Sequence, residues 1–566
     1  MSPHQGPRQQ PELRLGSFRD HLFEKANRKG RAVIISDDEG SDDEVVITRG
    51  RRIPVTKARK IIRINQVQQA ASRPLRLQPG SDVKLTDQSF IRIVEYIPNS
   101  AEGPFIRGHR LLFQNHWELL MQERKNELVQ LVKINDKMEV EDSMSTVPVH
   151  EVVGNCTVIF TNQEYPDLQY RKHIEVQTGD DQEQDIYFCR FKSADCNVAS
   201  DERDPSRPPK MGRIERLHQD EADNGVLVTQ TGEIEFAIPD PELRRRWRGA
   251  GRSQSKKYTF GDAFCGAGGT SSGAFQAGLK LKFSIDFDKA AIQTYRRNFG
   301  MTKAEILRED VAEFIRQASS LEGESIVDYL HMSPPCQPFC GCNRNPNREK
   351  NQKDIDSFSR VSALIEVCKP RIVTLEEAKS LTDIDKRKYF RKLISGFIRK
   401  GYSVQWKVVE LSKYGVPQTR NRTIIIASGP GEKLPPFVQP THGTGPGLLP
   451  IPTINSTINT IPADAEHQDE IPEMRSTKDA YAGDKLCQTI MTAVKPYHYH
   501  PSGTRRFSIR EYASLQTFEP TFTFEGTITE KLKQIGNAVP PLFAKTLFVH
   551  LKAALGAADD AEDMER

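Results

Sequence analysis

At 566 residues the chain is too long for one hydrophobic core, and its length predicts two or three domains with additional disordered parts. Its net charge of +4 and isoelectric point near 8.4 exclude a strongly basic protein, so any nucleic-acid surface must come from local patches. The nine cysteines have no regular spacing, and we see neither a signal peptide nor an apolar run long enough to span a bilayer. These features predict a reducing, intracellular setting without membrane contact.

Residues 1–85 contain few large apolar side chains and are expected to form a disordered charged tail. An acidic run, SDDEGSDDE, is followed by a basic cluster, RGRRIPVTKARK. The basic cluster is either a nuclear import signal or a DNA-phosphate patch, and the alternative is a solvated run of charge without a partner.

Residues 86–200 change to the alternating pattern of β-strands, as in SFIRIVEYI and DIYFCRF. The string VHEVVGNCTVIF together with DIYFCRF resembles a bromo-adjacent-homology domain, which implies contact with histones or other chromatin proteins. An unrelated β domain is the open alternative. Residues 201–257 are charged and Arg-rich and are expected to be a linker.

From Tyr258 to Ile425 strands and helices alternate, with continuous apolar runs such as RIVTLE and RTIIIAS. Such runs are typical of strands that are covered on both faces. The pattern predicts an α/β fold with a mostly parallel, doubly wound sheet and ligands at the carboxyl ends of its strands.

The first strand of this region leads into a glycine loop. In TFGDAFCGAGGTSSGAF an apolar run ends at Asp262, and Gly266, Gly268 and Gly269 precede a helical pattern. A second strand ends at Asp286, which could accept from ribose hydroxyls, and Phe287 beside it could stack on an adenine. The dinucleotide fingerprint expects Gly or Ala where this chain has Ser271, so the ligand is either a dinucleotide or an adenosine with a non-phosphate tail.

Cys336 is the best candidate for a nucleophile because it follows a short apolar strand in HMSPPCQPFC. The flanking prolines fix φ and hold the thiol in one orientation. An ordinary loop cysteine is the alternative. Cys340 and Cys342 complete no zinc-motif spacing with it, so no metal is expected.

Further motifs follow in order: RIVTLEEAKSL, KYGVPQTRNRTIIIAS, TRRFSIREYASLQTFEP and KLKQIGNAVPPLFAKTL. With the glycine loop and the Pro-Cys-Gln motif they resemble the ordered motif set of the cytosine-5 DNA methyltransferases, from Tyr258 to about Leu551. The resemblance implies S-adenosylmethionine as cofactor. It assigns cofactor contacts to Phe264, Gly266, Gly268, Gly269, Asp286, Phe287, Asp310 and Asn537.

The same resemblance implies a catalytic set of Cys336, Glu376 and Arg422. Cytosine C5 is a poor nucleophile, so the Cys336 thiolate would add to C6, while Glu376 protonates or hydrogen-bonds N3. Arg422 is a candidate for part of the positive field that favours the thiolate. The target base must be flipped out of duplex DNA to reach these groups.

Three features depart from the family pattern. Glu377 and Ala378 replace the Asn-Val that usually follows the catalytic Glu, Cys340 replaces a usual serine, and the target-recognition region is short. The altered motif and the domain order resemble the fungal subfamily linked to repeat-induced point mutation and premeiotic methylation, which implies gene silencing in the nucleus.

The expected domains are a catalytic domain at 258–556, with a compact target-recognition region at 429–504, and a disordered acidic tail at 557–566. The function implied is methylation of cytosine C5 in DNA. A tRNA cytosine-5 methyltransferase and a catalytically weak DNA-binding silencing factor are the alternatives.

Overall fold

The structure is a computed structural model that describes residues 60–63, 75–117, 120–121, 124, 126–141, 143–164, 186–194, 210–229, 232–249, 257–320, 323–335, 360–473, 480–492 and 499–565. The acidic run and nearly all of the basic cluster of the N-terminal tail lie outside the described residues. The chain divides into two compact units. One contains residues 1–66 and 224–235, and the other contains residues 67–223 and 236–566.

The smaller unit contains a three-stranded sheet in the order β1-β11-β12. β1 is parallel to β11, and β11 is antiparallel to β12. The strands are β1 (Lys60–Arg63), β11 (Gly225–Thr229) and β12 (Gly232–Glu235). A strand therefore occurs inside the segment expected to be a disordered tail, and two more occur inside the expected linker.

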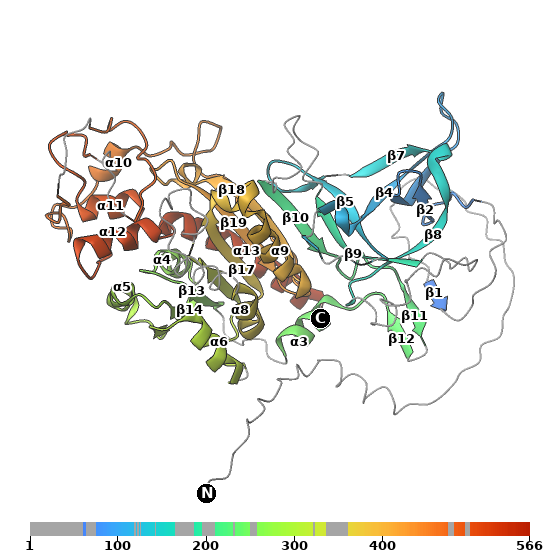
Figure 1. Ribbon diagram of the computed structural model, residues 1–566, viewed down its shortest axis with the longest axis horizontal. Helices are drawn as coiled ribbons and strands as arrows, with labels where there is room; N and C mark the ends of the chain where they lie inside the picture. The colour runs from blue at the N-terminus through green and yellow to red at the C-terminus, as the bar shows by residue number, and fades with distance from the viewer. Residues whose placement is uncertain are drawn as a thin grey trace, which may run out of the picture. The chain divides into compact units, whose positions relative to one another are not determined.

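The α/β part of the larger unit is built on five parallel strands in the order β15-β14-β13-β16-β17. β19 is antiparallel to β17, and β18 is antiparallel to β19 (Figure 1). The strands are β13 (Thr259–Ala263), β14 (Lys280–Ile285), β15 (Glu305–Leu307), β16 (Tyr329–Met332), β17 (Ile372–Ala378), β18 (Ser403–Glu410) and β19 (Asn421–Ser428). The mostly parallel α/β sheet expected from the sequence is confirmed.

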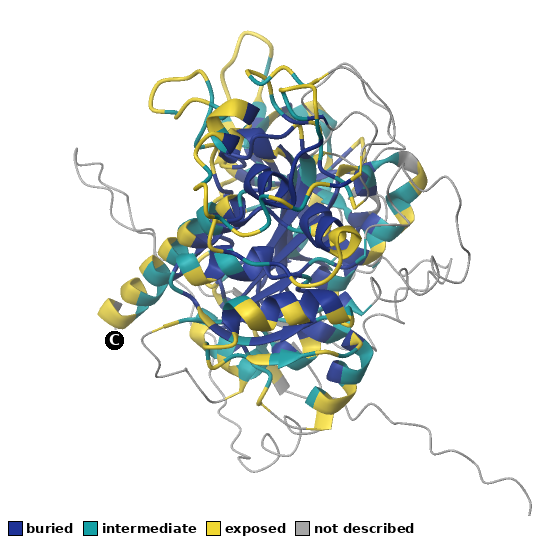
Figure 2. Cartoon of the chain, turned by 90° about the vertical axis from the view of Figure 1, so that its left-hand side faces the viewer, coloured by how far each residue is buried: buried dark blue, intermediate teal, exposed yellow. Residues whose placement is uncertain are grey.

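Helices cover both faces of this sheet. α4, α5, α12 and α13 contribute to one hydrophobic cluster, and α6, α8 and α9 contribute to the other. Figure 2 shows the strands buried and the outer sides of the helices exposed. The helices are α4 (Gly269–Gln276), α5 (Lys289–Phe299), α6 (Val311–Ser320), α8 (Val361–Cys368), α9 (Arg387–Arg399), α10 (Ile454–Ile458), α11 (Ile509–Leu515), α12 (Ile528–Asn537) and α13 (Pro541–Glu565).

α4 and α13 approach closely because Gly273 has no side chain. A Cβ at Gly273 would lie 2.4 Å from the backbone nitrogen of Lys545 in α13. Phe543, Leu547 and Leu551 recur every four residues and are buried along one side of α13. The long C-terminal helix is therefore an integral layer of the α/β part.

The β-rich segment forms a closed ring of strands. β9 pairs with both β8 and β5, and the path β8-β2-β3-β4-β5 completes the ring. These strands, with β6 and β7 beside them, are β2 (Asp82–Leu85), β3 (Phe90–Ile97), β4 (Phe105–Phe113), β5 (Glu127–Ile134), β6 (Val140–Glu141), β7 (Met144–Pro148), β8 (Val152–Phe160) and β9 (Ile186–Ala194). The resemblance to a bromo-adjacent-homology domain stays a prediction.

β10 (Met211–Arg216) joins this ring to the α/β sheet. It is antiparallel to β9 on one side and to β18 on the other. Residues 211–216 belong to the segment expected to be a linker, so that expectation is corrected for them. The local sequence is charged, but Arg213 is buried and paired with Glu215 at 3.0 Å, which offsets the cost of placing charge in a sheet.

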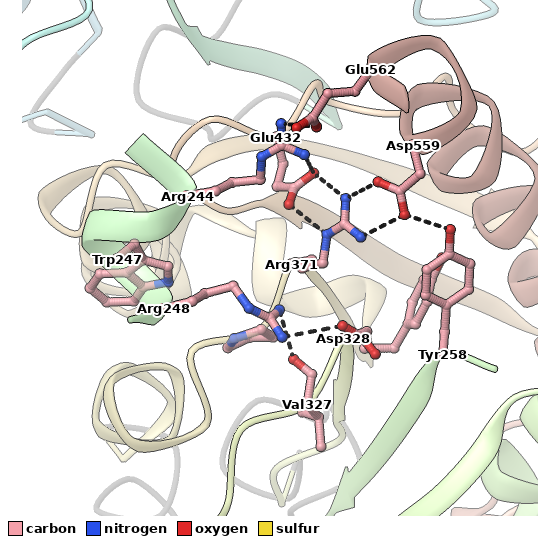
Figure 3. Close-up of polar contacts among 12 residues, drawn as sticks. Arg244, Trp247, Arg248, Tyr258, Val327, Asp328, Arg371, Glu432, Asp559 and Glu562 are labelled. Atoms are coloured by element: carbon pink, nitrogen blue, oxygen red, sulfur yellow. Dashed lines mark hydrogen bonds and ion pairs between the residues drawn. The ribbon is translucent and has the colours of Figure 1, made fainter. Parts of the chain in front are cut away.

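The acidic C-terminus is the second correction, because residues 557–565 form the end of α13 rather than a disordered tail. Asp559 accepts from the Arg371 guanidinium at 2.6 and 2.8 Å and from the Tyr258 hydroxyl at 2.8 Å (Figure 3). Glu562 pairs with Arg244 of α3 (Asp240–Arg248). Partners distant in the sequence therefore hold the tail in place.

Arg371 is the centre of this charge network. Its other side pairs with Glu432 at 2.6 and 3.0 Å, and Arg248 of α3 pairs nearby with Asp328 at 3.2 Å. Burial opposes the charge on Arg371, but the hydrogen bonds and charges of Asp559 and Glu432 outweigh it and raise its pKa. The network links the amino-terminal ends of β16 and β17 to the last turns of α13.

Replacing Asp559 with alanine should destabilise the protein by about 2 kcal/mol, because Arg371 would lose one of its two carboxylate partners in a mostly buried position. The free energy of unfolding, measured with urea, tests this. Asp560→Ala is the matched control, because Asp560 is exposed and adjacent in the sequence. Equal stability of the two variants would contradict the role of the network.

Candidate functional site

The glycine loop leaves β13 and turns directly toward the end of β14. Phe264 has a φ of 62°, and Gly268, with a φ of 96°, precedes the first residue of α4. A Cβ at Gly268 would lie within 3 Å of the rings of Tyr295 and Phe299, so only glycine fits there. The loop is tied to β14 by the amide of Cys265, which donates to the carbonyl of Ile285 at 3.0 Å.

Asp286 lies at the end of β14 and contacts the glycine loop. Its Oδ2 accepts from the amide of Gly266 at 2.9 Å, and its Oδ1 accepts from the amide of Asp288 at 2.8 Å. Burial raises the pKa of Asp286, and these two hydrogen bonds oppose that shift. Each carboxylate oxygen keeps a second lone pair that can accept from ligand hydroxyls.

Phe287 follows Asp286, and its side chain is 64% exposed, compared with 53% for Phe275. Its ring is thus available for stacking on a planar ligand. A Cβ at Gly266 would meet no atom within 4 Å, so there is open space beside the backbone of the loop. The loop, the carboxylate and the aromatic ring fit an adenosine-containing cofactor.

Asn537 and Asp310 are the two cofactor candidates that lie on other segments. Asn537 is exposed at the end of α12, and the following Val539 approaches the loop so closely that a Cβ at Gly269 would lie 2.4 Å from its carbonyl oxygen. Asp310 follows β15, and its Oδ1 accepts from the amide of Ala312 at 2.7 Å and pairs with Arg360. Asp310 is therefore at the neighbouring strand end but already holds two partners.

Asp262 is a buried residue of this region that the sequence reasoning did not assign to the site. Ser271 donates to its Oδ2 at 2.5 Å, whereas its Oδ1 has no hydrogen-bond partner among the described residues. Burial, and then the charge of Asp286, raise the pKa of Asp262 to about 7. Its position at the end of the first strand was the available signal.

Glu376, near the end of β17, and Arg422, near the start of β19, form an ion pair. The Nε of Arg422 lies 2.6 Å from Oε1 of Glu376, and both side chains are mostly buried. The pair lacks the alignment of a hydrogen bond, so the attraction is between charges.

The strand register explains why these two residues meet. Ala378 is opposite Arg422 and Glu376 is opposite Ile424, so Glu376, Ala378 and Arg422 share one face. Glu377 is opposite Thr423 on the other face and is fully buried. Its Oε2 accepts from the amide of Ala378 at 3.1 Å. Glu377 is therefore not directed toward Glu376.

Cys336 lies outside the described residues, as do Cys340 and Cys342, so its role stays a prediction. β16, which leads toward it, lies between β13 and β17. The amide of Ser333 donates to the carbonyl of Ala263 at 3.3 Å, and Nε2 of His331 contacts the Ser333 hydroxyl at 2.7 Å. Burial lowers the pKa of His331 to about 3, so this histidine is neutral.

Arg420 and Gln418 have a structural role that the sequence motif alone did not reveal. Arg420 is buried and donates to the carbonyls of Gly536 and Ala538 at 3.3 and 3.2 Å. Gln418 donates to the carbonyl of Leu515 at 2.7 Å. The Arg420 bonds hold the segment that carries Asn537, and the Gln418 bond holds the end of α11.

The described part of the chain contains no group of three or more His, Cys, Asp or Glu side chains positioned to hold a metal ion. No described helix is long and apolar enough to cross a membrane. A cleft of about 640 Å³ lies between α4, the end of α5 and residues 519–522, and its lining includes neither Gly266 nor Asp286.

The fold and these contacts define a nucleoside-cofactor site beside a carboxylate-arginine pair. The model of the C-5 cytosine-specific DNA methylase family matches residues 258–470 and 453–553, just over half of the chain. The chain belongs to the C-5 cytosine-specific DNA methylase family. The cofactor of this family is S-adenosylmethionine, and the residues around the glycine loop fit it.

The relatives include animal and bacterial proteins. DNA (cytosine-5)-methyltransferase PliMCI of Paracentrotus lividus is 33% identical over 193 residues, 32% of this chain and 12% of that protein. DNA (cytosine-5)-methyltransferase 1 of Gallus gallus is 30% identical over 33% of this chain and 13% of its own length. Type II methyltransferase M.NgoFVII of Neisseria gonorrhoeae is 29% identical over 51% of this chain and 85% of its own length.

The chain thus spans about an eighth of the two animal relatives and most of the bacterial one. Among solved structures, a putative DNA modification methyltransferase encoded within an E. coli prophage is 20% identical. It covers 53% of this chain and 100% of its own, with a TM-score of 0.39.

Replacing Asp286 with alanine should weaken S-adenosylmethionine binding by about 1 to 3 kcal/mol, because the ligand would lose a buried acceptor and the loop would lose its contact at Gly266. Isothermal titration calorimetry tests this. Glu305→Ala, which removes an exposed carboxylate from β15, should bind as the parent does. Tight NAD binding without S-adenosylmethionine binding would contradict the cofactor assignment.

Proposed function

We propose that the protein transfers a methyl group from S-adenosylmethionine to C5 of cytosine in DNA. The observation that carries the proposal is the Glu376–Arg422 pair at the same carboxyl edge of the sheet as the glycine loop and Asp286. A carboxyl group held at this edge can meet the ring of a base while the cofactor lies across the neighbouring strand ends. Family membership supports this assignment of roles.

In the proposed reaction the Cys336 thiolate forms a bond to C6 of a flipped cytosine, and electron density moves toward C5. Glu376 stabilises the ring by a hydrogen bond or proton at N3, and Arg422 keeps the Glu376 side chain in one position. S-adenosylmethionine supplies an electrophilic methyl group when bound. Loss of the C5 proton to a base then breaks the bond between Cys336 and C6.

Duplex DNA containing 5-fluorocytosine should trap Cys336, because fluorine at C5 cannot leave as the proton does. With S-adenosylmethionine present, a denaturing gel should show a covalent protein–DNA band that Cys336→Ala abolishes. Cys340→Ala is the matched control and should keep the band. A band that persists in Cys336→Ala would assign the nucleophile to another thiol.

Glu376 and Arg422 should act as one unit in catalysis. Arg422→Met should lower the rate of methyl transfer on DNA about 30-fold or more, for roughly 2 kcal/mol of lost positioning. In a double-mutant cycle with Glu376→Gln, the two effects should be strongly non-additive. Additive effects on the single-turnover rate would show that the two side chains act independently.

The wider role proposed here is methylation in the nucleus that silences repeats or genes. The resemblance to the fungal subfamily and the eukaryotic relatives support a nuclear protein that acts on DNA. Contact with chromatin through the β-rich segment is part of the same proposal.

Comparing duplex DNA with tRNA as acceptors of labelled methyl groups tests the substrate. Transfer to tRNA alone would favour the RNA methyltransferase. DNA binding without transfer to either acceptor would favour a silencing factor that is catalytically weak.

A further inference from the structure

Residues 379–392 concentrate positive charge next to the catalytic carboxylate. Six basic and two acidic residues give this stretch a net charge of +4, which equals the net charge of the whole 566-residue chain. The remaining 552 residues are therefore neutral in sum. The residues are Lys379, Lys386, Arg387, Lys388, Arg391 and Lys392, with Asp383 and Asp385. We propose that this basic segment binds the phosphate backbone of DNA beside the flipped base.

The basic segment starts at the edge of the sheet where the reaction is proposed. β17 ends at Ala378, and Lys379 begins a 3₁₀ turn that leads through a second turn to α9. Lys379 is three residues after Glu376, so their Cα atoms lie within about 11 Å of each other. A duplex with its target base at Glu376 thus passes within reach of the first lysines.

Three lysines of the basic segment are available to a ligand. Lys379, Lys388 and Lys392 are exposed and have no ion-pair partner among the described residues. Lys388 lies over the ring of Tyr389, with its Nζ 4.8 Å from the ring centroid. Lys386 pairs with Asp385, but Asp385 is largely exposed, and such a pair contributes little.

The shape of α9 orients these charges outward. Phe390, Leu393 and Phe397 are buried on the side of α9 that faces the sheet. Lys388 and Lys392 are four residues apart, so they share the exposed side and are separated by about 6 Å along the axis. Two nucleotide steps of one DNA strand advance by a similar distance, about 7 Å.

DNA phosphate is the occupant that best explains this arrangement. Lysine is a flexible point charge with three donors, which suits phosphates at somewhat variable positions. Backbone contacts fix the register of a protein on DNA without reading sequence, so this surface would position the target base. The inference rests on the proposed function, because it takes DNA as the substrate. The rival occupant is an acidic protein segment, such as residues 36–44 of this chain.

The test is a triple variant of the full-length protein, Lys379→Gln, Lys388→Gln and Lys392→Gln. Binding of a duplex oligonucleotide is measured at several salt concentrations. Each lost phosphate contact should reduce the slope of log affinity against log salt by about 0.9. KM for DNA should rise far more than turnover falls, and S-adenosylmethionine affinity should be unchanged.

The matched control removes the same charge elsewhere, through Lys280→Gln, Arg297→Gln and Lys303→Gln. All three residues are exposed, and Lys280 is at the amino-terminal end of β14, the edge opposite to the carboxyl edge. The control variant should keep the salt slope of the parent. Equal slopes for parent and lysine variant would overturn the proposal.

Two further outcomes separate the possibilities. A lysine variant that binds DNA like the parent but gains activity would show that an acidic protein segment occupies the surface, and the proposal would be wrong. If the parent transfers no methyl group yet the lysine variant loses salt-dependent DNA binding, the proposed function fails while the phosphate surface stands.

Discussion

The antiparallel pairing of β19 with β17 is the constraint on which the Glu376–Arg422 ion pair depends. The first four strands of the α/β order and β17 are parallel, so their carboxyl ends meet at one edge. β19 runs the other way, which brings its first residues to that same edge. A register slip of one residue would move Arg422 to the opposite face and leave Glu376 as a buried charge without its partner.

This register also determines on which face of the sheet the Glu377 side chain lies. The family pattern has an amide at this position, and this chain has a second carboxylate there instead. Alternation along β17 excludes direct sharing of one face, and Arg422 supplies a partner to Glu376 from the neighbouring strand. Glu376 is therefore held by a partner on the neighbouring strand rather than by a residue of its own strand.

The sequence predicted the parts of the molecule that depend on local pattern. Gly266 and Asp286 were expected to serve one ligand, and they are joined by a hydrogen bond. Glu376 and Arg422 were expected to belong to one catalytic set, with Arg422 favouring the Cys336 thiolate, and in the structure Arg422 forms an ion pair with Glu376. In both cases a strand end fixes the side chain within one or two residues, so strand order was enough to bring the groups together.

The parts that the sequence did not predict depend on partners far away in the chain. The charged sequence of β10 is typical of a linker, but in the structure β10 is paired with β9 on one side and β18 on the other. The acidic sequence at the end of α13 is typical of a disordered tail, but in the structure Arg371 and Arg244 pair with its carboxylates. The composition of a segment shows only that it has few apolar residues and many charges. Its strand partners and the opposite charges that neutralise it belong to other segments, so its own composition cannot reveal them.

Two arginines at or just before the start of β19 connect Glu376 to the segment that carries Asn537. Arg422 pairs with Glu376, and Arg420, two residues earlier, holds the carbonyls on both sides of Asn537. Residues two apart in an extended chain are separated by only about 7 Å, so the strand cannot move one arginine without the other. A shift of β19 would therefore disturb the ion pair of Glu376 and the hydrogen bonds to the segment that carries Asn537 together.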